Sequence, residues 1–352
     1  MAAQLTAGSG TAYQVIARSR RIARVRGLLV GSILAALVFV VFCVSLSVGD
    51  FPVPVSKVVP SIFGQGDRAT EFIINRLRLP RALTGLLVGA ALGMSGAVFQ
   101  SIARNPLASP DIIGITAGAS VSAVFAILIV GVTGWAVSGF ALVGAILTAL
   151  GIYVLAWRQG VSSYRLVLVG IGVGSVAVSA TSYLLTRSKV EVAQQALLWI
   201  TGSLNARDWT HVRSLSLALV VLVPLLSILV RRLRVLQLGD DTAAGLGLPV
   251  EKSRLAVILV GVALAAIATA AAGPIGFVAF VAPPIARWLC RSPGPSVIPA
   301  ALVGALVVSV SDFVGQHLIG DTPMPVGVIT GVVGAPYLLF LLARVNRVGR
   351  GG

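Results

Sequence analysis

Apolar residues dominate the chain in long unbroken runs rather than in alternation with polar ones. Each of ten runs holds about 20 residues, the length that an α-helix needs to cross a hydrocarbon layer of ~30 Å. They cover 27–47, 82–102, 112–132, 137–157, 165–186, 212–231, 255–273, 274–289, 297–314 and 326–343. A membrane β-barrel would instead show apolar and polar residues alternating along short strands. The pattern therefore predicts an all-α polytopic membrane protein of ten spans, of which 274–289 is the shortest.

Composition and the first apolar run agree with this prediction. The chain is 57% hydrophobic and 11% charged, whereas a soluble protein has about 25% charged residues. The first run follows a cluster of arginines and is too long for the core of a cleavable signal, so it predicts a retained anchor. Residues 1–17 are small and polar and predict a disordered end. The predicted organisation is a cytoplasmic basic tail over 1–26, a membrane domain over 27–344 and a cytoplasmic tail over 345–352.

Charge predicts how the chain lies in the membrane. The formal net charge is +16, with 27 basic residues, but these are spread over many loops and form no single face of the kind that binds nucleic acid. An even number of spans puts both termini on one side, and with that side cytoplasmic, eighteen of the basic residues lie inside, as the positive-inside rule favours. The other nine lie outside. They are either tolerated on translocated loops or form a basic surface for an acidic partner.

One connection between spans is unusually polar and rigid. The stretch RNPLASPDIIG (104–114) carries a cation, an amide, a carboxylate and two prolines. Pro106 and Pro110 break the helix, and Asp111 is suited to cap the span that follows. Irregular backbone at membrane depth persists only inside protein or beside water. The stretch is either an ordinary helix connector or a turn that lines a pathway.

Reactive chemistry is sparse in this sequence. The stretch 247–253 has a glutamate where a phosphate-binding loop has glycine, and no strand precedes it. His, Cys and carboxylates form no metal-binding spacing, no nucleophile has a base, and Cys43 and Cys290 fall on opposite faces of the predicted membrane domain. We therefore predict no catalytic residues, no metal, no cofactor and no enzyme activity. Asp312 lies well inside an apolar run, and is either functional or a hydrogen-bonded structural carboxylate.

Small residues predict close contacts between helices. Gly89 and Gly93, like Gly327 and Gly331, are spaced four apart inside apolar runs and favour helix packing. The word LVGAAL (87–92) also returns as LVGVAL (259–264) in a span that must run in the opposite direction. Such a recurrence is typical of the inverted repeats of transporters.

Several motifs together resemble one known family. GLLVGAALGMSGAVFQSIARNPLASPDIIGITAGAS (85–120) is similar to the permease subunits of bacterial ABC importers for ferric siderophores, haem and cobalamin. Further matches follow the family's order: RLRLPRAL (76–83), WITGSLNARDW (199–209), LQLGDDTAAGLGLPVEKSR (236–254), GPIGFVAFVAPPIAR (273–287) and MPVGVITGVVGAPYLLFLL (324–342). The chain departs from the family at two positions. Pro284 replaces a usual histidine, which puts an inner-face role there in doubt, and Gln316 replaces a frequent arginine, which weakens the outer docking surface.

The resemblance implies a type II ABC importer permease fold and three functional regions. It implies a cytoplasmic gate formed by two loops, with the residues Asn105, Leu107, Ser162 and Ser163. It implies a cytoplasmic loop over 236–254 that couples to the ATPase, with the residues Gly239, Asp240, Ala243, Leu246 and Gly247. The glycines and Pro249 predict two short helices in that loop, the first beginning at Asp240 and Asp241. Finally, Arg78 and Arg81 are implied to dock acidic residues of a binding protein.

The implied function is that of a permease subunit in an ATP-driven importer of iron–siderophore complexes, with the pathway at a dimer interface. Its partners are cytoplasmic ABC ATPase subunits, an extracytoplasmic substrate-binding lipoprotein, a second permease chain and the lipid bilayer. That second chain is either identical or a homologous sister. The implied location is the cytoplasmic membrane of a bacterium. Haem and cobalamin stay open as passengers. An autonomous channel or secondary transporter is a rival, although such a protein needs ionisable residues in its spans.

Overall fold

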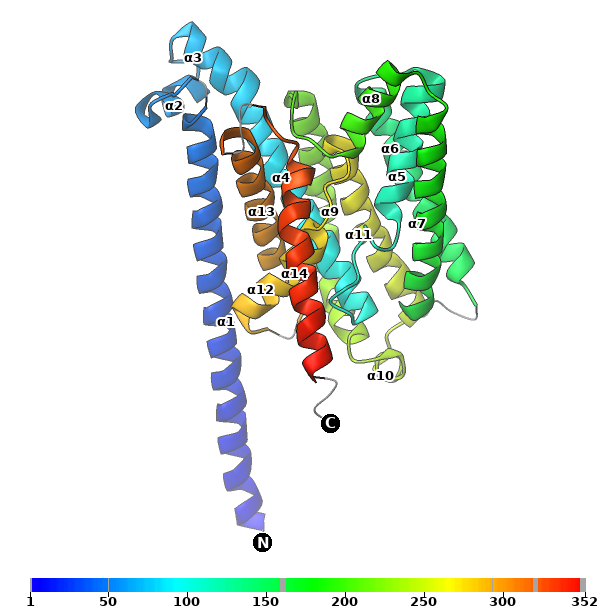
Figure 1. Ribbon diagram of the computed structural model, residues 1–352. Coiled ribbons are helices and arrows are strands. Elements are labelled where there is room, and N and C mark those ends of the chain that lie inside the picture. The colour runs from blue at the N-terminus through cyan, green and yellow to red at the C-terminus, as the bar shows by residue number, and fades with distance from the viewer. Residues whose placement is uncertain (1, 50, 159–162, 293, 319–321, 349–352) are drawn as a thin grey trace.

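The computed structural model describes residues 2–49, 51–158, 163–292, 294–318 and 322–348, and they form a bundle of helices (Figure 1). In chain order the helices are α1 (Ala2–Ser47), α2 (Val55–Ile62), α3 (Arg68–Phe72), the π-helical η1 (Ile73–Arg78), α4 (Leu79–Ala103), α5 (Ile115–Phe125), the π-helical η2 (Ala126–Val130), α6 (Trp135–Ala156), α7 (Ser163–Thr186), α8 (Val190–Ile200), α9 (Trp209–Leu236), α10 (Asp240–Gly245), α11 (Val250–Ala272), α12 (Val278–Cys290), α13 (Val297–His317) and α14 (Val326–Val348).

The ten predicted spans are confirmed as helices. Within the described ranges, seven helices are long and apolar enough to cross a membrane, and the shorter apolar helices 115–130, 278–290 and 326–341 fill the remaining three positions. Each of these ten helices overlaps one predicted run. α12 is the shortest, with 13 residues, as the sequence predicts for its run.

Helices α4 and α11 form the centre of the bundle and are mostly buried. α4 packs closely against α13 because glycine removes the side chains at the crossing. A Cβ at Gly89 would lie 2.4 Å from the Gly304 oxygen, and one at Gly93 would lie 2.1 Å from the Ala300 oxygen. The prediction that Gly89 and Gly93 serve helix packing is confirmed. α4 and α11 also run in opposite directions, as the repeated hexapeptides require (Figure 1).

The first 17 residues differ from the prediction. Residues 2–47 form one continuous helix, so the expected disordered end is wrong. The segment contains no proline and several alanines, and a helix already formed by the span extends at little cost because propagation needs no new nucleus. α1 stands at the side of the bundle and packs mainly on α13.

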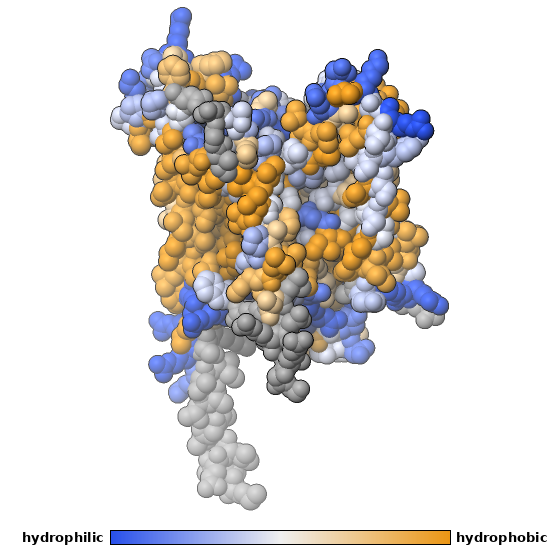
Figure 2. Space-filling model, in the orientation of Figure 1, coloured by the Kyte–Doolittle hydropathy of each residue, from blue (hydrophilic) through white to orange (hydrophobic). Residues whose placement is uncertain are grey.

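The two ends of the bundle differ in what they carry. The N-terminus, the end of α14 and α10 lie at one end, here called the α10 end, whereas α2, α3 and α8 lie at the other, the α3 end (Figure 1). An apolar belt runs between hydrophilic margins at both ends (Figure 2). The belt is the surface expected to face lipid.

Candidate functional site

The turn after α4 has a fixed shape. Arg104 adopts left-handed backbone geometry with φ of 50° and ends the helix. The Asn105 amide donates to the Gln100 oxygen at 3.2 Å, and the Asn105 Oδ1 accepts from the Leu107 amide at 2.9 Å. This Asx turn leaves Asn105 exposed and Leu107 half-buried at the α10 end. The polar residues of the turn thus organise its backbone.

Asp111 does not cap the following helix, which corrects the sequence prediction. Gly114, with φ of 85°, is the N-cap of α5, and the Ser109 hydroxyl accepts from the Ile112 amide at 3.3 Å. Glycine is required at 114 because a Cβ there would lie 2.8 Å from the Gly170 oxygen of α7. One Asp111 carboxylate oxygen is buried with no hydrogen-bond partner in the described part of the chain. Burial raises the pKa of Asp111 to about 6.

The second half of the predicted gate is described only in part. Ser162 lies outside the described residues, and Ser163 is the first residue of α7. The 104–114 turn contacts α7 through Gly114, which approaches both Gly170 and Gly174. The end of this turn therefore packs on the helix that Ser163 begins.

The predicted coupling loop contains one short helix rather than two. α10 covers Asp240–Gly245, and the expected second helix is the beginning of α11, which Pro249 precedes as N-cap. α10 ends in a Schellman motif, in which the Gly247 amide donates to the Ala244 oxygen at 2.8 Å and the Leu248 amide donates to the Ala243 oxygen at 3.0 Å. Two short helices were predicted because proline and glycine mark boundaries without showing which helix a residue joins.

The side chains of α10 separate into an inner and an outer set. Ala243 is fully buried and holds the helix against the bundle, whereas Leu246 is 65% exposed. Gly247 has φ of 81° and open space where a Cβ would lie. A substitution at Gly247 therefore strains the backbone without a steric clash. The arrangement presents a leucine on a defined turn at the α10 end.

Asp240 connects this loop to two other elements. Its Oδ1 accepts from Arg254 Nη2 at 2.6 Å and lies 3.7 Å from Arg104 Nη2, while Arg254 Nη1 contacts Glu251 Oε1 at 3.0 Å. The Arg254 side chain is only 5% exposed. The start of α10, the start of α11 and the residue before Asn105 thus share one charged cluster. The 14- and 136-residue separations of these partners hide the cluster from sequence inspection.

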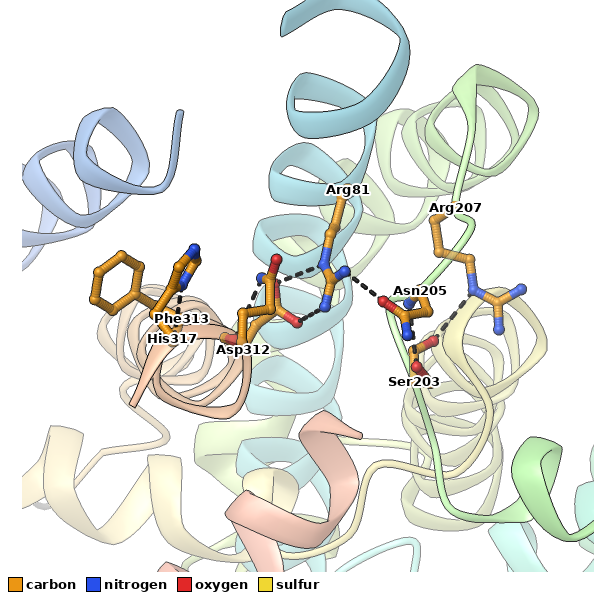
Figure 3. Close-up of polar contacts among 8 residues, drawn as sticks. Arg81, Ser203, Asn205, Arg207, Asp312, Phe313 and His317 are labelled. Atoms are coloured by element: carbon orange, nitrogen blue, oxygen red, sulfur yellow. Dashed lines mark hydrogen bonds and ion pairs between the residues drawn. The ribbon is translucent and has the colours of Figure 1, made fainter. Parts of the chain in front are cut away.

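At the α3 end, the guanidinium group of Arg81 lies between Asp312 and Asn205 (Figure 3). Its Nε and Nη2 atoms pair with the two carboxylate oxygens of Asp312 at 3.1 and 2.8 Å, and its Nη1 donates to the side-chain oxygen of Asn205. Gln316 donates to the same carboxylate at 2.7 Å. Asp312 is therefore a hydrogen-bonded structural carboxylate, one of the two predicted possibilities, and it ties α4 to α13.

Arg78 also has partners within the chain. It donates to the Leu46 oxygen at 2.8 Å and to the Phe51 oxygen at 2.6 Å, which holds the end of α1 against η1. Arg207, in the loop before α9, is likewise fixed, because its Nε donates to the Ser203 oxygen at 3.2 Å (Figure 3). Burial lowers the pKa of Arg207. Arg78 and Arg81, the two predicted docking arginines, thus lie at the α3 end of the bundle in defined orientations.

No group of three His, Cys, Asp or Glu within the described ranges could hold a metal ion. Within the described ranges, a bundle of ten apolar helices with a short exposed helix at one end and polar loops at both ends is the architecture of a polytopic membrane protein.

Comparisons with known proteins give the family. The model of the FecCD transport family matches residues 36–344, and the chain belongs to this family. The chain is 42% identical over 299 residues to the ferric enterobactin transport system permease protein FepG of Escherichia coli (strain K12), covering 85% of this chain and 91% of that protein. It is 37% identical over 322 residues to the probable siderophore transport system permease protein YfhA of Bacillus subtilis (strain 168), covering 89% and 94%.

A solved structure agrees with the fold. An inward-facing conformation of a metal-chelate type ABC transporter superposes with a TM-score of 0.80 at 28% identity, covering 89% of this chain and 98% of that one. The protein is the permease subunit of a bacterial ABC importer and a multi-pass membrane protein. The family predicted from the sequence motifs is confirmed, as is the prediction of a non-enzymatic permease. ATPase and binding-protein partners follow from this class.

Proposed function

We propose that the protein carries ferric–siderophore complexes across the cytoplasmic membrane, with the pathway at the interface between two permease chains. The named relatives support this passenger class, because two of the most similar ones are permease proteins of transport systems for ferric enterobactin and for siderophores. Haem and cobalamin are the alternative passengers. The second chain is either a copy of this one or a homologous sister.

We further propose that the α10 end faces the cytoplasm and that α10 receives the ATPase. The observation that carries this proposal is the exposed Leu246 on the Schellman turn of α10, beside the charged cluster of Asp240. A short helix with an exposed apolar residue fits a groove of a partner, and a rigid contact transmits rigid-body motion. Ala243 lies on the inner face of the same helix and is buried against the bundle. A displacement of Leu246 by the ATPase would therefore also displace the part of the bundle that contacts Ala243.

We propose that the pathway is closed at the cytoplasmic end by Asn105, Leu107, Ser162 and Ser163. The Asx turn supports it, since a pre-shaped turn holds Leu107 in one place. An apolar side chain at a constriction excludes water, while amide and hydroxyl groups bind a polar passenger without fixed charge. The packing of Gly114 on α7, the helix that begins at Ser163, is compatible with pairing of the two loops.

We propose that Arg78 and Arg81 recognise acidic residues on the extracytoplasmic binding lipoprotein. Both lie at the α3 end, which faces outward if α10 faces inward. Their internal partners orient them, but Asp312 already neutralises Arg81. Arg78 donates to two backbone carbonyl groups in the described part of the chain, which holds its guanidinium group in place at the same end.

The test is ATP hydrolysis by the purified complex of permease, ATPase and binding protein in lipid nanodiscs. We expect the binding protein loaded with a ferric siderophore to stimulate hydrolysis more than the unloaded protein, and haem- or cobalamin-loaded proteins to have no such effect. Uptake of radioactive iron by vesicles should require ATP. Passenger flux without any ATPase would refute the proposal in favour of an autonomous channel or secondary transporter.

A further inference from the structure

Two adjoining cavities lie near the α10 end, where the apolar belt meets the hydrophilic margin. The first has a volume of about 390 Å³ and lies between α1, α9 and the beginning of α13. Its walls are mainly apolar and include Gly27, Met94, Val223, Leu226, Val230 and Val297. The volume falls within the ~300–1,000 Å³ of small-molecule sites. Arg26 donates to the Leu289 oxygen at 3.0 Å and holds α1 against α12 beside this cavity.

The second cavity is polar and basic. It has a volume of about 750 Å³ and is lined by three arginines from three elements, Arg104, Arg234 and Arg287. Gln100 accepts a hydrogen bond from Arg287 and donates to the Phe280 oxygen at 3.0 Å, so the guanidinium group of Arg287 is fixed in position. Among the described residues that line the two cavities, none is acidic.

The two cavities meet at one cation. Arg234 and Gly294 line both, so the apolar cavity and the basic one adjoin at these two residues. This arrangement matches a molecule with a hydrocarbon part and an anionic head. Arg104 lies 3.7 Å from Asp240, but Asp240 is held more closely by Arg254 at 2.6 Å. The cavity therefore keeps an excess of positive charge.

We propose that the joined cavities form a site for one anionic phospholipid, with an acyl chain between α1 and α9 and the phosphate at Arg234, Arg104 and Arg287. Basic pockets between membrane helices at the headgroup level bind such lipids. A zwitterionic lipid would bring its own cation against the three arginines. A free anion would leave the apolar cavity unused. The basic cavity is also lined by Asn105 and Pro106 of the turn after α4, so a bound headgroup would lie beside the proposed gate.

The test uses native mass spectrometry of the purified transporter complex, taken from vesicles of equal dioleoyl-phosphatidylglycerol and dioleoyl-phosphatidylcholine. We expect the wild-type complex to retain phosphatidylglycerol in preference to phosphatidylcholine. Arg234→Gln should lower the apparent affinity of the complex for phosphatidylglycerol about five-fold, the usual effect of one basic residue near a charged lipid. Arg232→Gln is the matched control, since Arg232 is exposed on the same helix and lines neither cavity. Val223→Trp fills the apolar cavity and should also reduce retention.

Three results would overturn the lipid site. Equal retention of both lipids by the wild-type complex would remove the charge argument. Retention unchanged by Val223→Trp but abolished by excess inorganic phosphate would make the basic cavity a free-anion site. Loss of the ATPase from Arg234→Gln with unchanged phosphatidylglycerol retention would make the arginines a protein-docking surface. None of these measurements requires transport, so they are separate from tests of the importer itself.

Discussion

The ion pair between Arg81 and Asp312 is expected to be the strongest polar link between α4 and α13. Its side chains are 18% and 10% exposed, and both carboxylate oxygens are bound by the guanidinium group. The informative perturbation is Asp312→Asn, which keeps the size of the side chain and removes its charge. The Arg81 cation then stays largely buried without a countercharge, and Gln316 loses a charged acceptor.

The magnitude follows from burial. Removing one partner of a buried ion pair costs about 3–5 kcal/mol, because the remaining charge stays desolvated. The amide oxygen retains one acceptor and the pair is partly exposed, so we expect a loss of about 2–3 kcal/mol in the free energy of unfolding. At about 2–4 °C per kcal/mol, the midpoint of thermal unfolding in detergent should fall by roughly 5–10 °C.

A double-mutant cycle with Arg81→Gln isolates the pair. Because the double variant carries neither charge, it should be more stable than the sum of the single losses predicts, by about 1 kcal/mol or more. Arg213→Gln is the control for loss of a cation at the same end, since Arg213 is exposed, and it should change stability by less than about 0.5 kcal/mol. Additive single losses, within about 0.5 kcal/mol, would refute a direct interaction between Arg81 and Asp312.

Five further variants test the proposed sites and the buried carboxyl group of Asp111. Leu246→Asp and Gly247→Val should each reduce co-purification of the ATPase by about ten-fold while membrane insertion stays normal, one by charging the contact and the other by straining φ of 81°. Asp111→Asn should stabilise the protein by about 1–3 kcal/mol at pH 7.5 and much less at pH 4.5, measured by thermal unfolding. The reason is that burial raises the pKa of Asp111 from 3.8 to about 6, so the folded state favours the protonated form and wild-type stability falls as pH rises through that window. Leu107→Ala should increase passenger leak through reconstituted transporter at least several-fold, and cysteine at Asn105 should crosslink to the second permease chain in the closed state.

Three results would contradict the reasoning behind the α10, Asp111 and Asn105 variants. Normal ATPase binding and normal transport in both α10 variants would remove that helix from coupling. An Asp111→Asn effect that is the same at both pH values would show that the carboxyl group does not titrate in the folded protein. Absence of crosslinking in every nucleotide state would move Asn105 away from the pathway.

The helices could be predicted from the sequence because membrane spans are set by length and hydropathy, which are local properties. All ten runs became helices, and the glycine spacing in α4 correctly indicated a close crossing. The same spacing was less informative in α14. Gly327 does pack, since a Cβ there would lie 2.0 Å from the Thr201 oxygen, but Gly331 has nothing within 4 Å of that position. Spacing identifies a helix face without identifying its neighbour.

The polar contacts could not be predicted because they join distant parts of the chain. Arg81 and Asp312 are 231 residues apart, and Arg287 and Gln100 are 187 apart. Hydropathy gives the length of each span but not its rotation relative to the next one. The sequence could therefore show that Asp312 lies inside a span, and could not show which cation neutralises it.

The charged cluster around Asp240 is suited to a coupling role because its two links differ in strength. Arg254 is almost buried and lies 2.6 Å from Asp240, so α10 and α11 are expected to move as one body. Arg104 is 46% exposed and 3.7 Å away, and an exposed pair of this kind contributes only about 0–1 kcal/mol. A weak link can be exchanged between conformations at little cost, whereas a strong one would hold the gate turn in a single state. Under the proposed function, displacement of α10 by the ATPase therefore carries α11 with it and frees or engages Arg104, the residue directly before Asn105.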